Sequence, residues 1–83
     1  MAVSMEEITT LVGVQLGVKG VSPTDLLVET LGAESADVMN IVVAIEEKYQ
    51  LCIDEGDLAY VRTVADLLHL VHRVQASRDR GDA

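Results

Sequence analysis

The sequence predicts an all-α fold: a four-helix bundle with three longer helices, one short third helix, and a long loop between helices one and two. Apolar residues recur at the helical spacing in three segments, and a Ser or Thr precedes each apolar run. Hydrophobic residues make up 49% of the chain, yet Phe and Trp are absent and only two Tyr occur. Aliphatic side chains must therefore fill a modest core, which suits helices in one 83-residue domain.

The first helix is expected over residues 4 to 16. Ser4, followed three residues later by Glu7, has the sequence of a capping box. Gly17 is a suitable stop at the other end. Its apolar face comprises Met5, Ile8, Leu11, Val12 and Leu16.

A long connection over residues 17 to 34 contains Gly20, Pro23 and Gly32, which are typical of loops. Its apolar residues are expected to pin it onto the core: Val21, Leu26, Leu27, Val28 and Leu31. Structureless loops of this length are uncommon in compact domains and are often functional.

The second helix, expected over residues 35 to 50, has two distinct faces. One apolar stripe should bury it in the bundle: Val38, Ile41, Val42, Ile45 and Tyr49. The opposite side should be polar in a helix packed on one face. It instead carries Ala36, Met39 and Val43, together with Asn40 and Glu47. These are either scattered exposed apolar residues, which are common, or a docking strip flanked by carboxylates.

A short helical turn is expected over residues 54 to 60, and the last helix over residues 63 to 76. Thr63 is a suitable N-cap, and Asp66 places an acid in the first turn. The apolar stripe of this helix comprises Val64, Leu67, Leu68 and Val71. The pattern predicts a folded domain over residues 1–76 and a polar, disordered tail over 77–83.

The formal net charge of −8 makes nucleic acid an unsuitable partner and favours a partner with a basic surface. Between residues 25 and 66 there are ten acids against only Lys48 and Arg62. Cys52 is the single cysteine, so an internal disulfide is impossible and a reducing compartment fits. Neither a signal peptide nor a membrane span is expected. These features predict a cytoplasmic monomer.

Ser35, behind Gly32, stands where the second helix should begin. One interpretation is an ordinary N-cap; the other is a phosphodiester attachment site, because a helix N-terminus suits a phosphate. Ser35 has no evident base nearby in the sequence, so an enzyme is not expected. His69 and His72 are an i, i+3 pair without further ligands, so no metal site is expected, and both should face solvent.

The chain resembles the acyl carrier protein family over nearly its whole length. The similarity is strongest from Leu31 to Leu68 and rests on motifs at ordered spacing: Leu31-Gly32-Ala33-Glu34-Ser35-Ala36-Asp37, Ile45-Glu46-Glu47-Lys48-Tyr49, Asp54-Glu55-Gly56-Asp57-Leu58 and Arg62-Thr63-Val64. The resemblance implies a 4′-phosphopantetheine arm, derived from coenzyme A, on Ser35. By the same resemblance, the arm would hold acyl groups as thioesters and deliver them to enzymes of fatty-acid or polyketide biosynthesis.

By the same resemblance, the partners are a phosphopantetheinyl transferase and acyl-transferring or condensing enzymes with basic docking surfaces. The docking residues would be Ala36, Met39, Asn40, Val43, Glu46 and Glu47. The bundle interior near Ile53 and Val61 would shelter part of the acyl chain.

Four positions depart from the family pattern. Glu34 replaces the usual Asp, Ala36 replaces Leu or Met, Asn40 replaces a common acid, and Lys48 interrupts an acidic run. These departures favour a specialised member with its own partners, for example in polyketide synthesis. Two alternatives remain open at this point: a peptidyl or aminoacyl carrier, and an unmodified adaptor with the same bundle.

Overall fold

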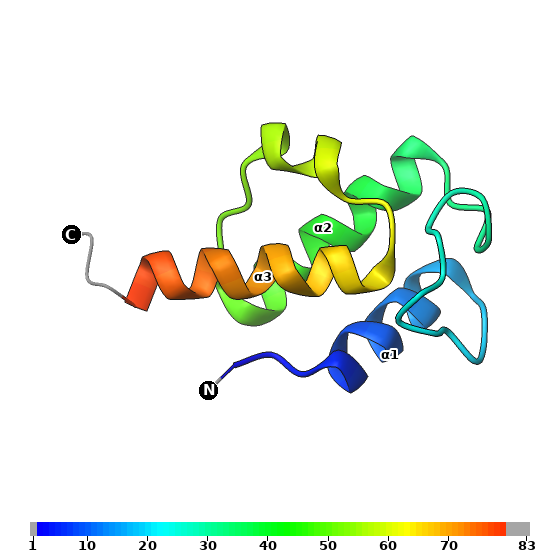
Figure 1. Cartoon of the computed structure of the whole chain (residues 1–83), viewed down its shortest axis with the longest axis horizontal. Helices are drawn as coiled ribbons and strands as arrows, with labels where there is room; N and C mark the ends of the chain where they lie inside the picture. Colours follow the sequence, from blue (N-terminus) through cyan, green and yellow to red (C-terminus); the bar gives the residue numbers. More distant parts are fainter. Residues whose placement is uncertain (1, 80–83) are drawn as a thin grey trace.

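The computed structural model describes residues 2–79 and consists of helices (Figure 1). Their order is α1 (Met5–Leu16), α2 (Ser35–Tyr49), the 3₁₀ helix η1 (Glu55–Tyr60) and α3 (Val64–Asp79). Helix α1 packs against both α2 and α3. In the view of Figure 1, α3 runs between α1 below and η1 above, and the long loop forms the end opposite the last turn of α3. The predicted all-α fold with a short third helix is confirmed.

Helix α1 begins and ends where the sequence predicts. The Ser4 hydroxyl accepts a hydrogen bond from the Glu7 N–H at 3.1 Å, and the Glu7 carboxylate accepts one from the Ser4 N–H at 3.0 Å. The bond from the Ser4 N–H stabilises the ionised carboxylate and so lowers the pKa of Glu7. Gly17 closes the helix in the left-handed conformation, with φ at 69°, which costs glycine little.

The core is built from the predicted apolar stripes. Seven large side chains are almost completely buried: Ile8, Val12, Ile41, Ile45, Val64, Leu67 and Val71. On the predicted inner face of α2, Val38 and Tyr49 are partly buried against these residues. The inner and outer faces of α2 are therefore assigned as the periodicity predicts.

The loop between α1 and α2 is anchored by Leu27, which is buried, whereas the expected burial of Val28 is wrong. The Leu27 N–H donates to the Arg62 carbonyl at 2.9 Å, and Leu26 forms an antiparallel bridge with Thr63. The backbone of residues 27–31 forms a turn, in which the N–H groups of Thr30 and Leu31 both donate to the Leu26 carbonyl at 3.0 Å. In this turn Leu27 packs in the core, whereas Val28 is 58% exposed.

At the start of α3, Thr63 and Asp66 form the predicted cap. The Thr63 hydroxyl accepts the Asp66 N–H at 3.0 Å, and the Asp66 carboxylate accepts the N–H groups of Thr63 and Arg62, both at 3.1 Å. These backbone bonds, that of Thr63 first, hold the pKa of Asp66 below its ordinary value of 3.8.

Helix α3 continues to Asp79, three residues beyond the predicted end at 76. The Arg78 guanidinium donates to the carbonyls of Tyr49 at 3.2 Å and Gln50 at 2.9 Å. It thereby ties the last turn of α3 to the end of α2. Residues 80–83, the remainder of the predicted tail, lie outside the described residues.

The N-terminal segment packs against α3 through Val3, which is buried. Its N–H donates to the Gln75 side-chain oxygen at 3.3 Å, and its carbonyl lies 2.7 Å from His72 Nε2. His69 is exposed as expected, but His72 is half-buried, so the expectation of solvent exposure was wrong for that residue. The sequence offered no sign of this contact, because its partners are 69 residues apart.

Candidate functional site

Ser35 is the first residue of α2, and the N-cap is Glu34. The Glu34 carbonyl accepts the Val38 N–H at 3.0 Å, and the Glu34 N–H donates to the Asp37 carboxylate at 3.0 Å. The interpretation of Ser35 as an N-cap is therefore wrong by one residue. Asp37, an acid three residues after Glu34, satisfies the Glu34 N–H and moves the cap one position upstream.

The Ser35 hydroxyl is accessible, while the backbone before it is anchored. Ser35 is exposed, and its hydroxyl has no hydrogen-bond partner within residues 2–79. Ala33 is buried, and its N–H donates to the Leu27 carbonyl at 2.9 Å. Gly32 adopts φ at 73°, and even an added Cβ there would meet no atom within 4 Å. Open space and unpaired N–H groups at a helix start suit a phosphate ester on this serine.

The outer face of α2 is as apolar as the periodicity predicts. Met39 is 39% exposed and Val43 is 44% exposed, while Ala36, Asn40 and Glu47 are also exposed on the same helix. The structure therefore brings five of the six predicted docking residues to one accessible surface.

Glu46, the sixth predicted docking residue, is half-buried and already bonded. Its carboxylate accepts the Ile53 N–H at 2.8 Å, which holds the segment that leaves α2. The bond satisfies the backbone donor of Ile53, whose side chain lies in the core. Glu46 therefore has a structural role that the sequence pattern did not indicate.

Three further large apolar residues lie on the surface, and the sequence pattern did not indicate a surface role for them. Val14 on α1 is 73% exposed, Val28 in the loop 58%, and Tyr60 at the end of η1 80%. Tyr60 belongs to a six-residue helix in which no residue is buried. An element this short carries too little periodicity to separate an inner from an outer face.

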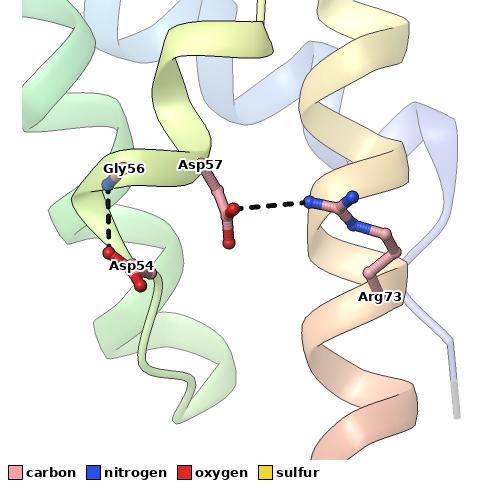
Figure 2. A network of polar contacts seen from close by, with 4 residues as sticks. All are labelled: Asp54, Gly56, Asp57 and Arg73. Atoms are coloured by element: carbon pink, nitrogen blue, oxygen red, sulfur yellow. Dashed lines mark hydrogen bonds and ion pairs between the residues drawn. The ribbon is translucent and has the colours of Figure 1, made fainter.

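Two polar contacts lie at the first half of η1 (Figure 2). The Asp54 carboxylate accepts the Gly56 N–H at 3.0 Å, and Asp57 lies 3.9 Å from the Arg73 guanidinium, with both side chains largely exposed. An exposed pair of this kind contributes only about 0–1 kcal/mol. This stretch is a solvated, capped turn. Within residues 2–79, no three His, Cys, Asp or Glu side chains gather as metal ligands would.

Comparison with known proteins gives consistent results. The family model described as "Phosphopantetheine attachment site" matches residues 6–71. The acyl carrier protein of Syntrophobacter fumaroxidans is 32% identical over 79 residues, covering 93% of this chain and 98% of the relative. That of Phaeodactylum tricornutum is 33% identical over 69 residues, covering 77% and 87%.

The chain belongs to the acyl carrier protein family. The solution structure of holo acyl carrier protein from Geobacter metallireducens shares the fold, with a TM-score of 0.79, 18% identity, and coverage of 95% of this chain and 93% of that one.

Family membership establishes that this is a carrier and not an enzyme, and that its prosthetic group is a covalently attached 4′-phosphopantetheine. The exposed serine at the open start of α2 fits that group. Such carriers interact with a phosphopantetheinyl transferase and with biosynthetic enzymes. Among the described residues, no helix combines the length and the apolar character that crossing a membrane requires.

Proposed function

We propose that Ser35 carries the phosphopantetheine arm of this acyl carrier protein, and that the arm delivers acyl thioesters to enzymes of fatty-acid or polyketide biosynthesis. The accessible Ser35 hydroxyl at the N-terminus of α2 is the observation that supports this assignment most directly. The arm supplies a terminal thiol that forms thioesters, and the chain's own residues position the arm and present it to partners.

Attachment is a phosphoryl-type transfer from coenzyme A. A bond forms between Ser35 Oγ and the phosphorus next to pantetheine, the pyrophosphate bond breaks, and 3′,5′-ADP leaves. The hydroxyl proton passes to a base of the transferase. The carrier contributes the Ser35 hydroxyl, which makes no hydrogen bond within the described residues and is therefore free to react. The N–H groups at the start of α2 stabilise the negative charge of the phosphodiester.

Docking is proposed at the outer face of α2, through Ala36, Met39, Asn40, Val43, Glu46 and Glu47. Met39 and Val43 would supply the desolvated centre, and Glu47 would attract a basic partner surface and speed encounter. Glu46, which is bonded to Ile53, would contribute through its charge more than through a direct contact.

A specialised pathway, such as polyketide synthesis, is proposed because Ala36 and Asn40 lie exposed within this docking surface. A small side chain and a neutral amide there present less apolar area and less charge than the bulky and acidic residues that the family resemblance implies. A cytoplasmic location and a monomeric state are part of the same proposal. The exposed thiol of Cys52 is compatible with a reducing compartment.

Intact-mass spectrometry after incubation with coenzyme A and a phosphopantetheinyl transferase tests the assignment. The wild-type chain should gain one phosphopantetheine group, and Ser35→Ala should gain none. Ser22→Ala removes a loop hydroxyl of the same type and should be modified like the wild type. Modification of Ser35→Ala to the wild-type extent would show that the arm is attached elsewhere.

A further inference from the structure

Among residues 2–79, the Arg62 guanidinium has no partner, although the protein is strongly acidic. The Lys48 ammonium lies 5.5 Å from the centre of the Tyr49 ring, and Arg73 lies near Asp57. The Arg62 guanidinium, in contrast, makes no hydrogen bond or ion pair with any residue of the described range 2–79. Its backbone is fixed, because its N–H donates to Asp66 and its carbonyl accepts from Leu27.

Arg62 lines a hollow of about 350 Å³ on the loop side of α2. The residues that line it are Leu27, Val28, Glu29, Val38, Val61 and Arg62. The walls are apolar, and the two charged side chains have opposite sign. Val61 was expected to shelter acyl chains, and it faces this hollow.

The hollow lies beside Ser35. Val38 follows Ser35 by three residues, which corresponds to a rise of about 4.5 Å along the helix axis. Backbone hydrogen bonds of 2.9 Å join Arg62 to Leu27 and Leu27 to Ala33, two residues before Ser35. A group attached to the Ser35 hydroxyl therefore starts one helical turn from Val38, which lines the hollow together with Arg62.

Charge in this region is unbalanced. Glu34 and Asp37 flank Ser35, and Glu29 lines the hollow, so a phosphodiester would add a further negative charge among carboxylates. Of the described residues that line the hollow, Arg62 alone is basic. A guanidinium can donate two parallel hydrogen bonds to a phosphate or a carboxylate, which makes it suited to hold such a group in one orientation.

We propose that Arg62 is a positioning residue whose guanidinium binds an anionic oxygen group of the arm. The group is either the phosphodiester at the root of the arm or the carboxylate of an acidic acyl cargo at its tip. Glu29 opposes either one and limits how firmly it is held. The proposal rests on attachment of the arm at Ser35.

The test compares Arg62→Gln with Lys19→Gln, which removes one positive charge from an exposed site on the groove beside α1. Each variant and the wild type are prepared as apo protein and loaded from coenzyme A, butyryl-coenzyme A and malonyl-coenzyme A. Thermal unfolding at low ionic strength gives the shift in Tm on loading. The NMR signal of the Arg62 Nε–H, and the ³¹P signal of the phosphodiester, report the contact directly.

Loading should raise the Tm of the wild type and of Lys19→Gln more than that of Arg62→Gln, by about 1–5 °C, as expected for one exposed ion pair. The difference should vanish near 1 M salt, where the Debye length is about 3 Å. A difference that is present without cargo identifies the phosphodiester, and one that requires malonyl identifies the carboxylate.

Equal shifts in Arg62→Gln and Lys19→Gln with every cargo, and an Arg62 Nε–H signal that does not move on loading, would overturn the proposal. Mass spectra of the same samples separate this outcome from failure of the proposed function. If no variant is loaded at Ser35, the attachment site itself is wrong, and the role of Arg62 is overturned with it.

Discussion

Ile45 and Val43 lie two residues apart on α2, and their substitution by Ala should have very different effects. Ile45 is fully buried, whereas Val43 is 44% exposed. Ile45→Ala deletes buried methyl groups and leaves a cavity, which destabilises by about 2–5 kcal/mol. A chain of 83 residues is expected to have a total stability of roughly 4–12 kcal/mol. The loss is therefore a large fraction of the total, and Tm should fall by at least about 8 °C.

Val43→Ala is the matched control, since it lies on the same helix and removes similar apolar atoms. It should change stability by no more than about 0.5 kcal/mol, because the exposed side chain leaves no cavity and Ala favours the helix. Urea unfolding followed by far-ultraviolet circular dichroism measures both variants. If Ile45→Ala does not fold, Ile45→Val should still lose about 0.5–1.5 kcal/mol. Equal losses at positions 45 and 43 would refute the assignment of the two faces of α2.

Three further predictions concern the surface and the ends of the helices. Glu47→Lys should weaken binding to a phosphopantetheinyl transferase and flatten the salt dependence of that binding, whereas Glu6→Lys on α1 should do neither. If Glu47→Lys binds like the wild type across a salt series, support for docking at α2 is removed. Backbone N–H groups at the start of α3 hold the pKa of Asp66 below its ordinary value of 3.8, so its carboxylate stabilises the fold above that pH and the contribution is lost on protonation. As the pH is lowered below about 4, the urea midpoint of Asp66→Asn should therefore decrease less than that of the wild type. Parallel dependences of the two midpoints on pH would argue against a stabilising role for the Asp66 carboxylate. His72→Ala should lower the free energy of unfolding in urea by about 1 kcal/mol, because it removes the bond between His72 and the Val3 carbonyl. The matched variant His69→Ala, at an exposed position, should change it little. Similar losses in the two variants would contradict a stabilising contact between His72 and the N-terminal segment.

Local patterns in the chain were sufficient to predict most of the fold. The capping box of Ser4 and Glu7 and the apolar stripe centred on Ile41 and Ile45 depend on residues three or four positions apart. These spacings place side chains on one helix face irrespective of the rest of the protein. The same local reasoning placed the start of α2 at Ser35, and the family comparison then supported a carrier.

Contacts between distant segments decided the remaining features. Val28 is exposed in the turn that Leu27 anchors to Arg62, and the Glu46 carboxylate accepts a backbone N–H seven residues away. His72 is half-buried because the N-terminal segment folds back onto α3.

The candidate site divides in the same way. The serine and its helix follow from nearby residues, because capping and periodicity act over one or two helical turns. The hollow beside the serine is lined by Arg62, whose guanidinium has no partner in the part of the chain that the structure describes. It exists only where the loop, α2 and the start of α3 meet. Such a meeting depends on packing among segments that are far apart in the chain, so no local spacing could have predicted it.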